Sequence, residues 1–253
     1  MGRLGGYSAG SIVQLNVSKT LTNFLVANQG LPSSDYDSSC DGTWLVLENI
    51  AYDFGVWDST NNDYANSDIH NYLNSTFLGS LDTAVQNAIK QVKIPYTNGV
   101  GTSGVVVSGA NGLSTKVFLL SMAECGFSDE EDYNIEGAKI DIEKSGSSGA
   151  LANGFYTRTP HRENDTRIWD VYGPVASTTI VTSTTYGFLP VFILPSNLWV
   201  DDAGNLFEKE FSGKTTVNGV AKDIVEGYAN VGGTWKEIVG GYANVGGVWK
   251  EIV

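Results

Sequence analysis

The pattern of apolar and polar positions along most of the chain is that of short β-strands. Two segments alternate apolar and polar side chains, as strands with one buried face do, and others are nearly continuous apolar runs, as in central strands. The predicted strands are residues 11–17, 23–28, 43–48, 155–160 and 187–194. The last of these predicts one apolar central strand that closes the domain.

Two short stretches have the apolar spacing of helices instead. Ser67 is a predicted N-cap, and Ile69 and Leu73 fall on one face of the helix that follows it. A second helix is predicted to start at Ser80 or Asp82, because an amphipathic stripe of period 3.6 begins there.

A further helical turn is indicated near residue 121. Ser121 and Glu124 have the spacing of a capping box, in which each side chain accepts a hydrogen bond from the other residue's backbone N–H. Gly126 is predicted to end this turn. Short helices among many strands predict an α+β fold.

The last forty residues repeat with a period of 14 residues, since segment 227–239 recurs at 241–253. Each unit has the pattern of a strand, a Gly-Gly or Asn-Gly turn and a second strand. Units this small cannot bury an apolar face alone. We therefore expect residues 1–210 to form one domain and 211–253 an attachment or oligomerisation module, with a β-extension packed on its own domain as the alternative. The predicted assembly residues are Tyr228, Trp235, Tyr242 and Trp249.

Composition narrows the possible partners. Asp and Glu number 28 and Lys and Arg 15, which gives a net charge of −13. An acidic chain is a poor binder of phosphate backbones and anionic lipid, so nucleic acid is excluded as an expected partner. No stretch approaches the ~18 apolar residues of a membrane span, and no apolar leader follows Met1. We expect no membrane insertion and synthesis in a cytoplasm.

Sequence signatures of catalysis and metal binding are missing. There is no GxSxG, HExxH, P-loop or dinucleotide-binding motif. Cys40 and Cys125 lack metal-ligand spacing and are predicted to be reduced, buried thiols, with a single disulfide as the alternative. His70 has no second ligand nearby, and the acidic run 129–132 lacks the spacing of a calcium loop. We therefore expect no metal, no cofactor and no enzymatic activity.

The segment from residue 158 to residue 172 has the side-chain types of a ligand-binding surface. Aromatic rings supply contact area, while Arg, Asn and Asp supply directional hydrogen bonds. The alternative is an ordinary exposed loop with Trp169 buried in the core. The predicted ligand contacts are Arg158, His161, Arg162, Asn164, Asp165, Arg167, Trp169 and Tyr172.

Several of these pieces occur in the order found in a known family. They are residues 42–47, 67–74, 117–121, 156–160 and 187–192. Over about residues 10–200 the chain resembles a lectin-like domain of unknown function common in Clostridia and their prophages, although Leu189 and Val191 stand where the family usually has Arg and Ala. This resemblance implies a C-type-lectin-like fold, with ligand contacts late in the domain as in related variable proteins.

The repeats are also similar to short C-terminal repeats on phage structural proteins. Together the two resemblances imply a bacteriophage virion protein, a head decoration or a tail or fibre component, that binds a host-surface glycan or protein. It would be made in the bacterial host cytoplasm, form a homo-oligomer or occur in many copies on the particle, and join other virion proteins through residues 211–253. A purely structural decoration or assembly protein without a ligand is the alternative. A formylglycine-generating-type enzyme is more remote, because Cys40 and Cys125 do not match the late cysteine pair of such enzymes.

Overall fold

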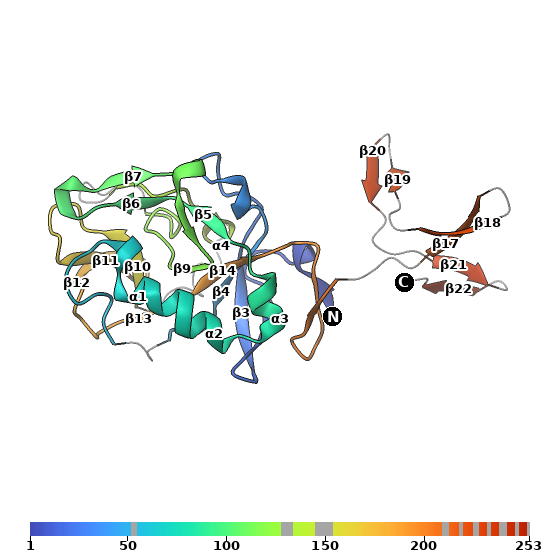
Figure 1. The fold of residues 1–253 in the computed structure, drawn as a ribbon, viewed down its shortest axis with the longest axis horizontal. Coiled ribbons are helices and arrows are strands. Elements are labelled where there is room, and N and C mark those ends of the chain that lie inside the picture. The colour runs from blue at the N-terminus through green and yellow to red at the C-terminus, as the bar shows by residue number, and fades with distance from the viewer. Residues whose placement is uncertain are drawn as a thin grey trace. The chain divides into compact units, whose positions relative to one another are not determined.

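The computed structural model describes residues 1–51, 55–127, 134–144 and 154–208, together with six strands between residues 213 and 251 (Figure 1). The chain divides into two units, Met1–Phe207 and Glu208–Val253, and each is described by itself. The first unit is α+β, as the sequence predicts, because most of its elements are strands in several sheets and its helices are few and short.

The largest sheet has five antiparallel strands and carries much of the apolar core. Its order in space is β2 (Ile12–Val17), β3 (Thr20–Gln29), β4 (Thr43–Leu47), β14 (Val191–Leu194) and β9 (Val117–Phe118). Strand β14 is buried along its whole length, because it is apolar at every position and has a neighbour on each side. The Trp44 and Phe118 rings meet edge-on across this sheet, with centroids 5.4 Å apart.

A second sheet of four strands carries the predicted ligand segment. Its order is β12 (Val175–Ile180), β11 (Arg167–Tyr172), β10 (Phe155–Pro160) and β13 (Gly187–Phe188). Strands β10 and β13 are parallel, and the other pairs are antiparallel. Residues 161–166 connect β10 to β11, at the left of Figure 1.

The apolar run at 187–194 is two strands rather than one, which corrects the prediction of a single closing strand. Its first two residues form β13 in the four-stranded sheet, and its last four form β14 in the five-stranded sheet. Pro190 lies between them and has no N–H to donate to a ladder, so the run is interrupted there. The Pro190 carbonyl still accepts a hydrogen bond from the Leu47 N–H at 3.0 Å.

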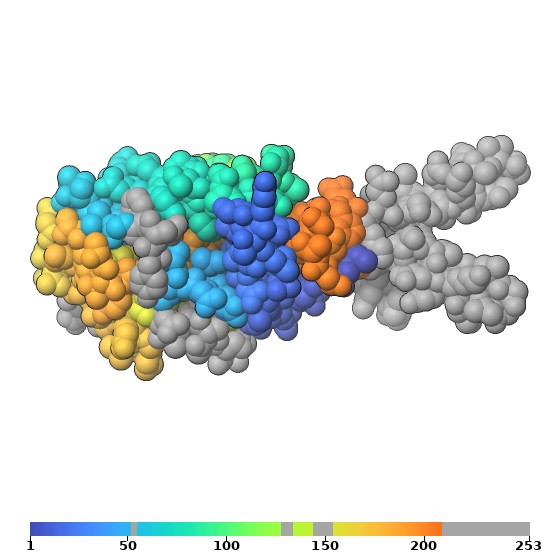
Figure 2. Space-filling model, turned by 90° about the horizontal axis from the view of Figure 1, so that it is seen from below, coloured from blue at the N-terminus to red at the C-terminus, as the bar shows by residue number. Residues whose placement is uncertain are grey.

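Shorter strands complete the first unit. A three-stranded sheet is formed by β1 (Gly2–Arg3), β15 (Trp199–Val200) and β16 (Leu206–Phe207). Two further strand pairs are β5 (Val92–Ile94) with β8 (Leu113–Thr115) and β6 (Tyr96–Asn98) with β7 (Val105–Val107). The pairing of β1 with β15 brings the N-terminal residues beside residues near 200, and Figure 2 shows this blue and orange contact. A 3-10 turn, Gly101–Ser103, lies between β6 and β7.

Three short helices follow one another along one side of the unit (Figure 1). They are α1 (Asp68–Tyr72), α2 (Leu78–Ser80) and α3 (Thr83–Ala88), with a π-helical turn at Leu73–Phe77, and a further turn, α4 (Asp141–Lys144), packs beside β3. The Ser67 hydroxyl accepts a hydrogen bond from the His70 N–H, which confirms the predicted N-cap. Asp82 directly precedes α3, one of the two predicted starts.

The predicted capping box is present at Ser121. The Ser121 hydroxyl accepts a hydrogen bond from the Glu124 N–H at 3.1 Å, and the Glu124 carboxylate accepts one from the Ser121 N–H at 2.9 Å. The residues that follow form a turn rather than an α-helix, and Gly126 ends it with a φ of +89°.

The described part of the second unit is three antiparallel strand pairs. They are β17 (Gly213–Val217) with β18 (Val220–Ile224), β19 (Tyr228–Val231) with β20 (Thr234–Glu237), and β21 (Tyr242–Val245) with β22 (Val248–Glu251). The predicted assembly residues occupy equivalent positions: Tyr228 and Tyr242 begin β19 and β21, and Trp235 and Trp249 are second in β20 and β22. The predicted turns at 218–219, 232–233 and 246–247 lie outside the described residues.

Candidate functional site

Residues 161–166 form an exposed loop whose backbone is held by one buried amide. The Asn62 side chain has no exposed surface. Its Nδ2 donates to the carbonyls of His161 and Asn164, each at 3.0 Å, and to that of Arg167 at 2.7 Å. Its Oδ1 accepts a hydrogen bond from the Gly101 N–H at 3.3 Å. One side chain therefore fixes both the loop and the turn Gly101–Ser103.

A cleft of about 380 Å³ lies between this loop and this turn. It is lined by Val100, Gly101, Thr102, Ser103, Glu163 and Asp165. Gly101 has a φ of +50°, a backbone conformation that favours glycine, and an added Cβ would lie 3.5 Å from the Asp165 Cβ, in ordinary van der Waals contact. Carboxylates accept hydrogen bonds, while hydroxyls both donate and accept them. The cleft therefore suits a small polar ligand.

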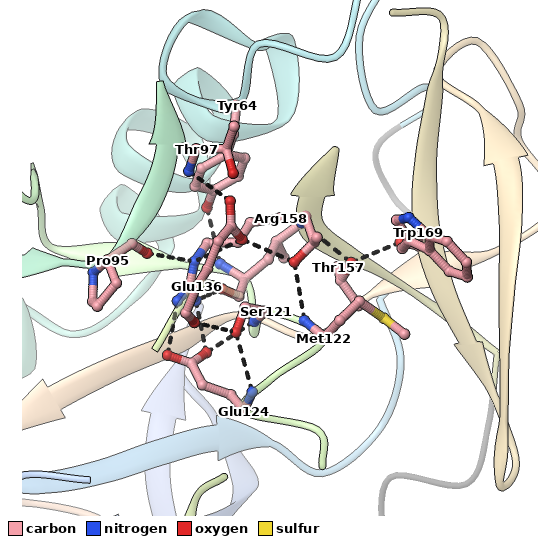
Figure 3. A network of polar contacts seen from close by, with 12 residues as sticks. Tyr64, Pro95, Thr97, Ser121, Met122, Glu124, Glu136, Thr157, Arg158 and Trp169 are labelled. Carbon is pink, nitrogen blue, oxygen red and sulfur yellow. Dashed lines mark hydrogen bonds and ion pairs between the residues drawn. The ribbon is translucent and has the colours of Figure 1, made fainter. Parts of the chain in front are cut away.

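Arg158 is not available to a ligand at the surface, which corrects its prediction as a contact residue. Its side chain is fully buried. The guanidinium donates two hydrogen bonds to the Glu124 carboxylate at 2.6 and 2.8 Å, and others to the Leu119 and Pro95 carbonyls at 2.7 and 3.1 Å (Figure 3). A buried charge is tolerated when it is paired and hydrogen-bonded. Arg158 is therefore a core residue.

A second carboxylate, Glu136, completes the network in Figure 3. Its Oε2 lies 3.8 Å from the Arg158 Nε, and its oxygens accept hydrogen bonds from the Thr97 N–H at 2.6 Å and the Thr159 hydroxyl at 2.8 Å. Burial raises the pKa of Glu136, and the positive charge of Arg158 opposes this shift. One guanidinium thus lies against two carboxylates that are closed to solvent.

Trp169 is also enclosed, with 7% of its surface exposed. The prediction of this ring as a ligand contact is therefore corrected, and the alternative, a tryptophan buried in the core beside an exposed loop, describes it. His161 stacks on the Trp169 ring, with centroids 5.9 Å apart and planes 8° apart. The half-buried His161 also accepts a hydrogen bond at Nδ1 from the Glu163 N–H at 3.1 Å.

The remaining predicted contacts reach the surface to different degrees. Arg162, Asn164 and Asp165 are exposed, and Tyr172 is 62% exposed on β11, away from the loop. The Asn164 Oδ1 accepts hydrogen bonds from the N–H and hydroxyl of Thr166 at 3.0 and 2.7 Å. The half-buried Arg167 donates to the Thr178 hydroxyl at 3.1 Å. The structure brings Asp165 into the cleft and commits Asn164 and Arg167 to local contacts.

The sequence did not single out Asn62 or the two hydroxyl residues of the cleft, Thr102 and Ser103. Asn62 stands in a polar run, Asn61-Asn62-Asp63, which resembles many surface loops. Its role depends on carbonyls 99 to 105 residues later in the chain. Only knowledge of which loops meet in space could have revealed it.

The two cysteines are buried free thiols. Burial raises the pKa of Cys40 to about 11 and also raises the pKa of Cys125. Both thiols therefore stay protonated and unreactive at neutral pH.

Among the described residues, no group of three or more His, Cys, Asp and Glu side chains is placed to hold a metal ion. The acidic run at 129–132 lies outside them. None of the described helices is long and apolar enough to cross a bilayer.

The fold and the cleft together define an α+β domain with a small polar surface site. The profile of the family described as "Domain of unknown function (DUF6273)" matches residues 41–196, which is more than half of the chain. The protein belongs to this family. The matched range contains the cleft, Asn62 and all three charged members of the Arg158 network. No curated protein and no solved structure matches the chain.

Proposed function

We propose that the protein is a bacteriophage virion structural protein, a head decoration or a tail or fibre component, that binds a glycan or protein on the host surface. Its first unit would have a C-type-lectin-like fold. The observation that carries the binding role is the cleft between the turn Gly101–Ser103 and the exposed loop 161–166. The virion assignment rests on the resemblance of the domain and of the C-terminal repeats.

The chemistry of the cleft favours a polyhydroxylated ligand. Glu163 and Asp165 offer carboxylate acceptors, and Thr102 and Ser103 offer hydroxyls, a combination that matches the donors and acceptors of a sugar. The walls are preorganised through Asn62, so little ordering opposes binding. An open site of this size binds weakly, and many copies on one particle would supply avidity.

The second unit would attach the protein to other virion proteins. Its equivalent strand pairs place Trp235 and Trp249 at the same register position, opposite Asn230 and Asn244. Large aromatic residues contribute most of the buried area in small β-units. Replacing both tryptophans by alanine is expected to abolish incorporation into particles, measured by mass spectrometry of purified virions, while the first unit stays folded.

The binding role is tested with a matched pair of double variants. Glu163→Gln with Asp165→Asn removes both carboxylates of the cleft, and Asp202→Asn with Glu208→Gln makes the same change of charge at exposed positions elsewhere. The full chain, biotinylated and multimerised on streptavidin, is applied to an array of bacterial surface oligosaccharides. We expect selective binding that the cleft variant loses and the control keeps. Equal binding by both variants, or no binding by the wild type, would refute the cleft as a glycan site.

A purely structural role is favoured by a different observation. Tyr172, Val175 and Ile180 are large apolar residues of the hairpin β11–β12 that are between 47% and 62% exposed. Such residues commonly pack against a neighbouring subunit. A particle structure in which another subunit covers the loop 161–166 would favour this alternative.

A further inference from the structure

Asp170, in the middle of β11, is a buried carboxylate that forms no ion pair with any cation in the described parts of the chain. It has no exposed surface, and the hydroxyl of Ser177 is its hydrogen-bonding neighbour. The Ser177 hydroxyl, across the ladder on β12, favours the charged form, but burial has the larger effect and raises the pKa of Asp170 to about 6. Such a group destabilises the folded chain, so folding does not explain its presence.

Three tyrosines lie on the same side of the sheet as this carboxylate. Side chains alternate along a strand, so Tyr172 shares the face of Asp170 on β11, and Tyr156 shares it as the directly paired residue of β10. Tyr186, from the segment before β13, contacts both rings, with centroids 6.0 Å from Tyr156 and 6.2 Å from Tyr172. Burial and the charge of Asp170 both raise the pKa of Tyr186. We call Tyr156, Tyr172 and Tyr186 the tyrosine cluster.

The tyrosine cluster is held in place by specific contacts. The Tyr156 hydroxyl donates to the Ser183 carbonyl at 2.8 Å and accepts from the Tyr186 N–H at 3.2 Å. The rings of Tyr186 and Tyr172 also pack on the backbone of Gly154. A Cβ at Gly154 would lie 2.4 Å from the Tyr186 Cδ1, a distance at which atoms clash. The positions of these rings therefore depend on a glycine at this point.

We propose that Asp170 and the tyrosine cluster form a binding site for an organic ammonium group. A bound ammonium would supply the positive charge that Asp170 lacks, and the ring faces attract a cation through their quadrupoles. Calcium and magnesium prefer several oxygen ligands, whereas here one carboxylate lies on the same side of the sheet as three aromatic rings. A net charge of −13 further favours cations near the protein.

This site is distinct from the cleft of the proposed function. The cleft belongs to the loop that precedes β11, whereas Asp170 lies within the strand and the tyrosine cluster extends toward its far end. The carboxylate is covered, so a ligand must displace part of the cover. The Tyr172 ring, 62% exposed, is the member that turns aside most easily. Amino sugars and choline head groups both carry the required ammonium chemistry.

The test uses the full chain and small probes. Choline chloride, glucosamine hydrochloride, neutral N-acetylglucosamine and calcium chloride are titrated at pH 7 and constant ionic strength, with isothermal titration calorimetry as the readout. We expect choline or glucosamine to bind saturably and N-acetylglucosamine not to bind. Binding of choline alone assigns a quaternary ammonium, and binding of glucosamine assigns an amino sugar.

Two variants and a control locate the site. Asp170→Asn should lower the affinity for the ammonium at least tenfold, and Tyr172→Ala about two- to fivefold by removing one ring. Asp165→Asn, in the cleft, should leave this affinity unchanged. If Asp170→Asn does not fold, Tyr172→Ala decides. The proposal is overturned if neither ammonium binds, if calcium binds in their place, or if Tyr172→Ala and Asp170→Asn bind as tightly as the wild type.

Discussion

Replacing Arg158 by alanine should strongly destabilise the first unit. The substitution leaves Glu124 and Glu136 buried without their cation, and it removes the donors to the Leu119 and Pro95 carbonyls. Removing one partner of a buried ion pair typically costs about 3–5 kcal/mol of unfolding free energy. Since 1 kcal/mol shifts the melting temperature of a domain of this size by about 2–4 °C, the expected drop is roughly 6–20 °C.

The measurement is urea unfolding followed by tryptophan fluorescence, because Trp44 and Trp57 are fully buried and report loss of the core. Arg158→Lys keeps the charge but loses the two-pronged contact with Glu124, so an intermediate loss is expected. Arg162→Ala, four residues later and exposed, is the control and should change stability by less than about 0.5 kcal/mol. A loss below about 1 kcal/mol for Arg158→Ala, combined with weaker ligand binding, would refute the core assignment.

Four other changes test the remaining features. Asn62→Ala should cost about 2–4 kcal/mol of stability by releasing the carbonyls of the loop 161–166, seen as a lower urea midpoint and faster amide exchange in that loop. Burial lowers the pKa of His70 from 6.5 to about 4, so between these pH values the unfolded chain binds a proton at His70 that the folded chain does not bind. The free energy of unfolding should therefore fall as the pH drops from 6.5 to 4. This pH-dependent loss of stability should be absent in His70→Gln. Burial raises the pKa of Asp170 from 3.8 to about 6, so the folded chain binds a proton at this carboxyl more tightly than the unfolded chain does. The stability that this protonated carboxyl contributes is fully present below pH 3.8 and is lost as the pH rises through 6. Asp170→Asn should therefore be more stable than the wild type at pH 7 by about 1–3 kcal/mol in the same unfolding assay. Residues 1–207 alone should melt at the temperature of the full chain by circular dichroism, and an unfolded fragment would show that the repeats belong to the same cooperative unit.

Local features of the fold could be predicted from the sequence because neighbouring residues determine them. The Ser67 cap and the Ser121–Glu124 capping box depend on contacts three residues apart, alternation identified β2 and β3, and an apolar run identified β4. Which strands pair depends on contacts between distant residues. The change of sheet at Pro190 was missed for this reason, since an apolar run looks the same in one sheet or in two.

The candidate site was predicted less completely. The exposed loop after β10 was identified by its polar side chains. Arg158 lies close to this loop in the sequence and was predicted as a surface contact, because a buried arginine and an exposed one are the same residue type. Its partners, Glu124 and Glu136, precede it by 34 and 22 residues, so its burial could not be read from its neighbours. The same holds for Asp170, whose isolation depends on which rings the sheet brings around it.

The anchoring of the loop through Asn62 has a consequence for how the site can change. Asn62 binds only main-chain carbonyls of the loop, which every residue type possesses. The exposed side chains of Arg162, Glu163 and Asp165 take no part in this support. Under the proposed binding role, substitutions at Glu163 and Asp165, which line the cleft, should therefore alter the ligand preference while the loop keeps its course. The loop backbone is thus held independently of the side chains that the proposed function assigns to ligand binding, so those side chains can change with little loss of stability.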